Sequence, residues 1–166
     1  MISLGIIGLG RWGPNLLRNF ASMEGVSIRM VCDIDNTRLL LIQKRYPGIL
    51  CTTYPHDIFG RRDIDCVVIS TPLSAHFSLA RQRLESGYHV LVEKPLAASS
   101  QECEELIEIA KRKGKLLFVG HTFIYNSGIK AAKGYIERGE LGKIYLIDAN
   151  RTNLGPVRYD ANTLWD

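Results

Sequence analysis

Three glycines with a fixed spacing stand near the amino end of the chain: Gly8, Gly10 and Gly13, with Arg11 and Trp12 before the third. They follow a short apolar run and lead into an amphipathic segment, which is the strand–turn–helix setting of a dinucleotide-binding loop. The first glycine permits a tight turn, the second lets the backbone approach a pyrophosphate, and the third lets helix and strand pack closely. Free N–H groups at the start of the helix attract the phosphates. A plain strand–helix turn is the alternative interpretation.

An acidic residue stands at the distance expected for a ribose ligand. Asp33 lies 20 residues after Gly13, at the end of the second apolar run, and about 20 residues is the spacing of the carboxylate that binds the ribose of NAD. The same charge repels the 2′-phosphate of NADP, whereas the nearby Arg38 could accommodate that phosphate. Asp33 could also be a solvated turn residue. We predict that the chain binds NAD(H) more tightly than NADP(H).

Two opposite charges and a proline, Glu93-Lys94-Pro95, directly follow another apolar run. Sites in doubly wound folds lie at the carboxyl ends of the strands, so this position is beside the predicted cofactor. A lysine at such an edge can take up and release a proton during a reaction. An exposed ion pair before a turn is the alternative interpretation.

The elements that must hold these residues alternate along the chain. Short apolar runs predict strands, and segments with apolar residues at helical spacing predict helices between them. The expected strands cover residues 3–8, 28–33, 65–70, 88–92 and 116–119, and the expected helices cover residues 14–22, 37–46, 75–86 and 99–113. Repeated strand–helix–strand units imply an α/β fold, a Rossmann-type doubly wound parallel sheet covered on both faces.

The last of these helices has the clearest boundaries. Ser99 and Glu102 have the spacing of a capping box, and Gly114 ends the helix. One buried face is predicted from four apolar residues at helical spacing: Cys103, Leu106, Ile107 and Ala110.

The pattern changes after residue 120. Residues 127–138 predict one more helix, and residues 143–152 alternate enough to predict a strand of a different sheet. We therefore expect a Rossmann domain over residues 1–120 and, over residues 121–166, the start of a second domain that the chain does not complete. The edge of the second sheet could pair with another copy of the chain, which would give a homo-oligomer.

Composition limits the classes of protein to which these motifs can belong. The chain has 166 residues, of which 46% are hydrophobic and 23% charged, as is typical of soluble globular proteins. The net charge of +4 is small and scattered, which argues against nucleic-acid binding. No apolar run approaches the ~20 residues of a membrane-spanning helix, and a strand is predicted where a signal peptide would lie. We expect a cytoplasmic protein without membrane attachment.

The four cysteines, Cys32, Cys51, Cys66 and Cys103, show no CxxC spacing. Cys32 and Cys66 lie inside apolar, strand-like runs. Free thiols, the two in strands buried, are therefore expected, with neither a metal site nor a disulfide framework.

The order and spacing of three motifs resemble one family. Gly8–Gly13, then Ser70-Thr71-Pro72 with His76 downstream, then Glu93-Lys94-Pro95, are similar to the glucose–fructose oxidoreductase/inositol dehydrogenase (Gfo/Idh/MocA) family. Its members pair a Rossmann domain with a carboxy-terminal α/β domain built on a large open sheet. The resemblance implies an NAD-dependent oxidoreductase that moves a hydride between the nicotinamide and a ring hydroxyl of a sugar.

The resemblance also implies roles for single residues. It makes Lys94 the active-site lysine and places Glu93 near the nicotinamide ribose. It implies that Thr71, Pro72 and His76 line the cofactor. Residues 121–166 correspond to the beginning of the substrate and oligomerisation domain.

A narrower resemblance comes from the later part of the chain. Residues 120–126 and 150–158 are similar to bacterial sugar-nucleotide members, such as UDP-N-acetylglucosamine or UDP-N-acetylglucosaminuronate 3-dehydrogenases of surface-polysaccharide pathways. Arg151 and Arg158 carry forked donors that could meet a diphosphate or a sugar carboxylate, or they could be solvated loop charges. His121 is predicted to support the site rather than to react. An inositol or a free sugar is the alternative substrate.

Members of the family usually carry an Asp-x-x-x-His motif in the second domain. Asp166 matches its aspartate, so Lys94 and Asp166 are the catalytic candidates, and the matching histidine would follow after the last residue. The resemblance assigns proton removal to the lysine–histidine pair, and such groups contribute ~10²–10⁴-fold. We therefore expect this chain to bind NAD(H) and to turn over poorly. A non-enzymatic NAD-binding module is the alternative.

Overall fold

The computed structural model describes residues 1–150 and 152, and this part divides after Gly120 into two compact units. The first unit, residues 1–120, alternates strands and helices. In chain order its elements are β1 (Ile2–Ile7), α1 (Gly13–Ala21), β2 (Val26–Cys32), α2 (Asn36–Arg45), β3 (Leu50–Thr52), the 3₁₀ turn η1 (Pro55–Ile58), β4 (Cys66–Ile69), the 3₁₀ turn η2 (Leu73–Ala75), α3 (His76–Glu85), β5 (His89–Val92), α4 (Ser100–Lys113) and β6 (Leu117–Val119).

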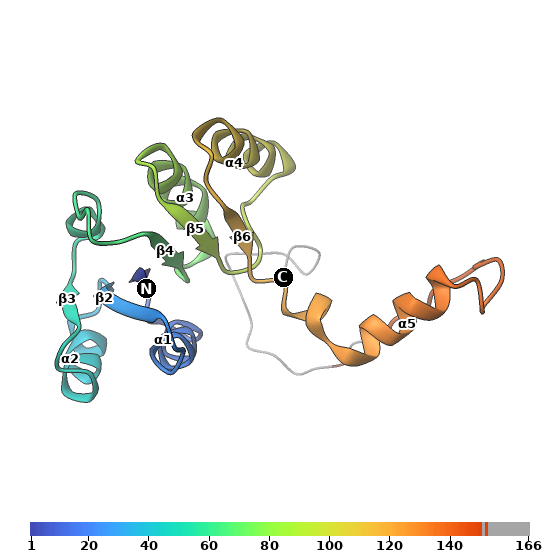
Figure 1. Cartoon of the computed structure of the whole chain (residues 1–166), viewed down its shortest axis with the longest axis horizontal. Helices are drawn as coiled ribbons and strands as arrows, with labels where there is room; N and C mark the ends of the chain where they lie inside the picture. Colours follow the sequence, from blue (N-terminus) through green and yellow to red (C-terminus); the bar gives the residue numbers. More distant parts are fainter. Residues whose placement is uncertain (151, 153–166) are drawn as a thin grey trace. The chain divides into compact units, whose positions relative to one another are not determined.

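The six strands form one parallel sheet in the order β3-β2-β1-β4-β5-β6. Helices α1 and α2 cover one face, and α3 and α4 cover the other (Figure 1). The connections run outward in opposite directions from β1 and β4, which makes the gap between these two strands the topological switch point. The predicted α/β Rossmann fold is confirmed.

Strand residues alternate between two apolar cores. On β1, Ile6 packs with α1 and α2 while Ile7 packs with α3 and α4, and Val68 and Val67 on β4 divide in the same way. All four side chains are at most 2% exposed. Because both faces are covered, the strands are apolar throughout, as expected of a parallel sheet.

Backbone hydrogen bonds align the carboxyl ends of neighbouring strands. The residue after each of five strands donates its N–H to a carbonyl of a neighbouring strand, at 2.8–3.2 Å: Gly8 to Cys32, Asp33 to Thr52, Ser70 to Ile7, Glu93 to Ile69 and Gly120 to Val92. The register of the sheet therefore brings the first residue of every following loop to one edge.

Helix α4 begins and ends where the sequence predicts. The hydroxyl of Ser99 accepts from the N–H of Glu102 at 3.2 Å, and Gly114 ends the helix in the left-handed region at φ 61°. The carboxylate of Glu102 reaches the N–H of Ala98, at 2.9 Å, instead of that of Ser99. The capping box is therefore shifted by one residue on its acidic side.

The buried face of α4 differs from the prediction at one position. Leu106 and Ala110 are buried and Cys103 packs against them, but Ile107 is 42% exposed and Ile109 is buried in its place. The buried face of α4 includes Ile109 because the helix packs against α3 as well as against the sheet.

Three short elements of the first unit were not predicted: β3, η1 and η2. β3 has three residues at the edge of the sheet and exists through its pairing with β2. The predicted helix over residues 75–86 begins as η2 and continues as α3. Such short turns carry too few residues for a period to be recognised.

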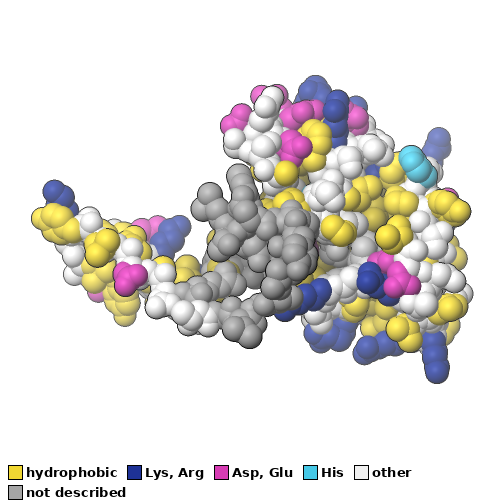
Figure 2. Space-filling view, turned by 180° about the vertical axis from the view of Figure 1, so that it is seen from behind, with side chains coloured by type: hydrophobic (Ala, Val, Ile, Leu, Met, Phe, Trp, Pro, Cys, Tyr) yellow, Lys and Arg dark blue, Asp and Glu magenta, His cyan; other side chains and the backbone are white. Residues whose placement is uncertain are grey.

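The second unit begins at His121, and its described residues form the 3₁₀ turn η3 (Thr122–Tyr125) and α5 (Ser127–Glu137). The side chain of Asn126 caps α5, accepting from the N–H groups of Gly128 and Ile129. Apolar side chains are exposed along α5 (Figure 2), among them Ile129, Tyr135 and Ile136.

The predicted strand over residues 143–152 is wrong for residues 143–150, which form no strand. A strand is held by hydrogen bonds to a neighbour, and the described residues of the second unit include no other strand with which it could pair. Ile144, Tyr145, Leu146 and Ile147 are consequently exposed. The homo-oligomer predicted from this edge stays a prediction.

No helix within residues 1–150 and 152 is both long and apolar enough to cross a membrane. The four cysteines are free thiols; Cys32 is buried and the others are partly buried. Burial, aided by the charge of Asp33, raises the pKa of Cys32 to about 12, and burial raises that of Cys66 to about 11. These two thiols are therefore protonated at neutral pH.

Candidate cofactor-binding site

The predicted site segments of the first unit meet at the carboxyl edge of the sheet. The glycine loop follows β1, Asp33 follows β2, Thr71 follows β4, and Glu93 and Lys94 follow β5. β1 and β4 flank the switch point, so the loop and Thr71 lie on its two sides. Ligands of doubly wound sheets bind at this position.

The first and third glycines are required by close approach. Gly8 has φ +95°, and a Cβ there would lie 2.7 Å from the backbone of Ser70. A Cβ on Gly13 would collide with the carbonyl oxygen of Gly8. The hydroxyl of Ser70 donates to that same carbonyl at 2.7 Å. Ser70, which the sequence did not single out as a site residue, therefore joins the end of β4 to the glycine loop.

The second glycine borders open space instead. The nearest atom to a Cβ on Gly10 would be Nη1 of Arg38, at an ordinary 3.7 Å. Helix α1 begins beside it with no side-chain cap and no acidic residue in its first turn, so its amino end keeps its partial positive charge. Arg11 and Trp12 are exposed here, Trp12 by 51%. These features suit an anionic group such as a pyrophosphate.

Asp33 is buried, with 5% exposure, and both of its oxygens are used. Oδ2 accepts from the N–H of Leu9 at 2.6 Å, and Oδ1 accepts from the N–H of Asp35 at 2.8 Å. The carboxylate is thus part of the architecture of the loop and not a solvated turn residue. A carboxylate has about four acceptor positions, so a further donor can still be accommodated.

Arg38 lies between two carboxylates. Its Nη1 is 3.5 Å from Oδ2 of Asp33, and its Nε is 3.2 Å from Oδ2 of Asp35. Hydrogen bonds from Thr37 hold the pKa of Asp35 below its usual value, so the carboxylate of Asp35 is charged near neutral pH. The two acids and one arginine leave this corner with a net negative charge.

Thr71, Pro72 and His76 belong to the turn between β4 and α3. The hydroxyl oxygen of Thr71 is buried and has no hydrogen-bond partner among the described residues. His76 is 2% exposed, and both of its ring nitrogens contact backbone carbonyl oxygens. In this structure Thr71 offers an unsatisfied polar atom to a ligand, whereas the ring of His76 is occupied by the protein.

Glu93 and Lys94 are neighbours in another turn, the one that follows β5. Oε2 of Glu93 accepts from the N–H of Lys94 at 3.3 Å, and the carboxylate lies against Gly120, where a Cβ would approach it to 3.1 Å. Both side chains are half-buried. The pair is therefore held at the edge and is not a fully solvated ion pair.

Three predicted site residues, Asp166, Arg151 and Arg158, lie outside the described residues. His121, predicted to support the site, begins the second unit and is exposed. The candidate site of the first unit is consequently built from residues 8–94.

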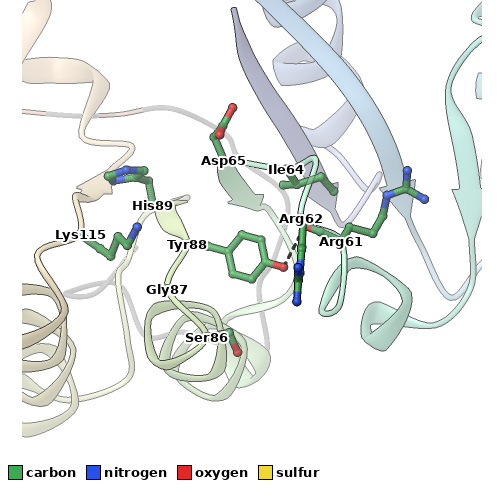
Figure 3. A pocket seen from close by; sticks show the side chains of 9 residues that line it. All are labelled: Arg61, Arg62, Ile64, Asp65, Ser86, Gly87, Tyr88, His89 and Lys115. Atoms are coloured by element: carbon green, nitrogen blue, oxygen red, sulfur yellow. Dashed lines mark hydrogen bonds between the residues drawn. The ribbon is translucent and has the colours of Figure 1, made fainter.

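A pocket of about 300 Å³ lies elsewhere in the first unit. Tyr88 crosses it toward Arg61, whose carbonyl accepts from the tyrosine hydroxyl at 3.2 Å, while His89 and Lys115 approach from the other side (Figure 3). These residues precede β4, β5 and β6 or, in the case of His89, begin the strand, whereas the candidate site follows the strands. The pocket thus lies at the amino ends of the parallel strands, whereas the candidate site lies at their carboxyl ends, so the pocket is not part of the candidate site.

The doubly wound sheet and its glycine loop define a dinucleotide-binding protein. Residues 2–121 match the family described as the oxidoreductase family with an NAD-binding Rossmann fold, Gfo/Idh/MocA, and the chain belongs to this family. The predicted family is confirmed, and with it a nicotinamide cofactor, NAD. The preference for NAD(H) over NADP(H) and the role of each site residue stay predictions.

The chain is similar to several dehydrogenases. Inositol 2-dehydrogenase of Salmonella typhimurium is 30% identical over 160 residues, which are 94% of this chain and 47% of that protein. The crystal structure of the WlbA dehydrogenase from Chromobacterium violaceum, solved with NADH and UDP-GlcNAcA, is 28% identical with a TM-score of 0.79 over 87% of this chain and 42% of that one. The myo-inositol 2-dehydrogenase of Lactobacillus plantarum also has a TM-score of 0.79, at 26% identity over 86% and 43%. The chain spans about half the length of these relatives.

Proposed function

We propose that this chain is the cofactor-binding part of an NAD-dependent oxidoreductase acting on a ring hydroxyl of a sugar or sugar nucleotide. The proposal depends on one observation: the glycine loop, Asp33 and the Glu93–Lys94 turn all lie at the carboxyl ends of their strands, β1, β2 and β5. When bound, NAD supplies the hydride acceptor. Residues 1–120 act as the NAD-binding domain, and the residues from 121 onward begin the substrate domain.

The residues fit the parts of the cofactor in a simple order. The amino end of α1 and the open side of Gly10 receive the pyrophosphate. Asp33 accepts from the ribose hydroxyls on the adenosine side. The buried hydroxyl of Thr71 gains the partner that it lacks.

Lys94 is the residue that handles the proton of the substrate hydroxyl, with Glu93 beside it. An alcohol must lose this proton as its carbon loses hydride, so a proton acceptor is needed at the edge where the nicotinamide lies. Asp166 is proposed to join Lys94 in catalysis, and Arg151 and Arg158 to contact the substrate. Because these three residues lie outside the described residues, their roles rest on the family resemblance.

Net negative charge beside the ribose position favours NAD(H). Arg38 is already paired with Asp33 and Asp35, so binding a 2′-phosphate would require the arginine to leave both acids. Exposed ion pairs are weak, and the larger effect is the repulsion between the phosphate and the buried carboxylate of Asp33. We expect NAD(H) to bind at least about tenfold more tightly than NADP(H), equivalent to ~1.4 kcal/mol.

Titration of the 166-residue chain with NADH and NADPH, followed by cofactor fluorescence, tests the cofactor proposal. Tighter binding of NADPH, or no binding of either, would overturn it. Substrate class is tested with a version of the chain extended by a complete substrate domain, by adding UDP-N-acetylhexosamines, their uronates, myo-inositol and free sugars together with NAD and following NADH formation. The inositol dehydrogenase relatives favour an inositol as the second candidate. Because the 166-residue chain is itself expected to turn over poorly, the non-enzymatic module is favoured only if a version with a complete substrate domain also binds NAD and oxidises none of these compounds.

A further inference from the structure

His76 is a buried histidine whose ring lies between two loops of the candidate site. It is the first residue of α3 and is 2% exposed. Its Nδ1 is 2.8 Å from the carbonyl oxygen of Pro95, and its Nε2 is 2.8 Å from the carbonyl oxygen of Thr71. One carbonyl belongs to the turn after β4 and the other to the turn after β5, so a single ring spans the two turns.

Both contacts require the ring to donate, because a carbonyl oxygen is only an acceptor. A neutral imidazole donates from one nitrogen, and a protonated imidazole donates from both. In either state at least one turn is hydrogen-bonded to α3 through this side chain. Such a bond is buried, and its loss would leave a carbonyl unsatisfied.

The two acceptor carbonyls belong to residues at or next to proposed site residues, Thr71 and Lys94. Pro95 follows Lys94 directly and has no N–H of its own with which to anchor the turn, so its carbonyl is its only backbone hydrogen-bonding group. The N–H of Lys94 makes a long contact of 3.3 Å to Glu93. At the other end, the carbonyl that His76 holds belongs to Thr71, whose hydroxyl is buried without a partner among the described residues.

We propose that His76 donates through Nδ1 to the carbonyl of Pro95 and is thereby a positioning residue that ties the Lys94 turn to the start of α3, which follows the Thr71 turn, without itself touching cofactor or substrate. This inference rests on the proposed function, in which Thr71 contacts the cofactor and Lys94 handles the substrate proton. It differs from the role implied by the family resemblance, in which His76 lines the cofactor, because the ring is buried and each of its nitrogens lies 2.8 Å from a backbone carbonyl oxygen.

The test compares two variants of the 166-residue chain. His76→Phe keeps a planar ring but removes both donors, and His76→Gln restores a donor of similar reach. His56→Phe is the matched control, since His56 is an exposed histidine of η1. The position of Lys94 is followed by carbon NMR of the dimethylated lysines, with a Lys94→Arg variant to assign its signal, and NADH affinity is measured alongside.

We expect His76→Phe to shift the Lys94 signal and to weaken NADH binding by about tenfold, the scale of one lost buried hydrogen bond. His76→Gln should recover both, at least in part, and His56→Phe should change neither. A folded His76→Phe chain with an unchanged Lys94 signal would overturn the proposal, as would a folded His76→Gln chain that matches His76→Phe.

Two further features keep the outcome interpretable. If His76→Phe does not fold, His76→Asn replaces it. The amide donor of asparagine is one methylene shorter than that of glutamine, so it should hold the Lys94 turn less well. Equal Lys94 signals in the Asn and Gln variants would then overturn the proposal. The Lys94 signal is recorded without cofactor. Failure of the wild-type chain to bind NADH would therefore overturn the proposed function and leave the positioning role of His76 to be decided by NMR.

Discussion

Oδ2 of Asp33 lies 2.6 Å from the backbone nitrogen of Leu9, inside the glycine loop. The residue proposed to bind the ribose therefore also holds the loop proposed to bind the pyrophosphate. Because the carboxylate is 5% exposed, its removal affects both the stability of the fold and the affinity for the cofactor.

Asp33→Asn should lower both quantities. The amide keeps one acceptor but turns its NH₂ group toward one of two backbone N–H groups, and an unsatisfied buried donor costs about 1–3 kcal/mol. The lost charge also removes the repulsion of a 2′-phosphate, so the ratio of NADPH to NADH affinity should rise about tenfold. Thermal unfolding and cofactor titration measure the two effects. Asp35→Asn, at the half-buried N-cap of α2, is the comparison: asparagine keeps an acceptor for the N–H of Thr37, so stability should fall less than in Asp33→Asn.

Gly10→Ala and Gly13→Ala form a matched pair. A methyl group at Gly10 meets no protein atom closer than 3.7 Å, whereas one at Gly13 collides with the backbone of Gly8. We expect Gly10→Ala to unfold like the wild type but to bind NADH at least about tenfold more weakly, because the methyl occupies the pyrophosphate position. Gly13→Ala should lose ~1–3 kcal/mol of stability. Equal unfolding temperatures for the two variants would contradict this assignment.

Arg83 should be replaceable with a gain in stability. Its guanidinium is fully buried, has no hydrogen-bond partner among the described residues and stacks on the ring of Phe59. Burial lowers the pKa of Arg83 to about 10, which reflects the poor solvation of its charge. Arg83→Met should raise the free energy of unfolding by ~1 kcal/mol, because apolar replacement of a buried ion often stabilises. Arg81→Met, at an exposed position of α3, is the control and should change it by less than ~0.5 kcal/mol.

The cysteines should differ in reactivity. The thiolate is the reactive form, and Cys32 and Cys66 have pKa values raised to about 12 and about 11. Reaction of the native chain with a thiol reagent near pH ~8 should modify Cys51 and Cys103 first. Mass spectrometry of the peptides identifies the labelled residues, and early labelling of Cys32 would contradict the structure.

The same two thiols predict a loss of stability in alkali. Both folded pKa values lie above the ordinary value of 9.0, so the unfolded chain releases these protons first, and stability falls as the pH rises from about 9 toward 11–12. A Cys32→Ala/Cys66→Ala chain should show a smaller decline across this range in denaturant titrations. An equal decline in both chains would assign the effect to other groups.

The sequence predicted the elements that carry strong local signals. Ser99 and Gly114 mark the ends of α4 because a cap and a left-handed glycine act within a few residues. β3 was missed and the strand at residues 143–150 was wrong for one shared reason. A strand depends on its neighbour, and neighbours are not encoded locally.

The candidate site likewise has a part that could be predicted from the sequence and a part that could not. The placement of the glycine loop, Asp33 and Lys94 could be predicted, because each directly follows an apolar run and parallel strands bring their carboxyl ends together. The contacts of Asp33 with Leu9 and of His76 with Pro95 join residues 24 and 19 positions apart. Only the packed sheet brings these atoms within hydrogen-bond distance, so no local pattern could have revealed them.

β1, which precedes the other five strands of the sheet in the chain, is one of its two central strands. β1 pairs with β2 on one side and with β4 on the other. A nascent chain emerging from the ribosome can form the first pair once residue 32 is free, but the second edge of β1 stays open until residue 69 has emerged. An apolar strand with an open edge invites association with other chains. We therefore expect this chain to depend on chaperones during synthesis more than a protein whose sheet grows outward from one edge.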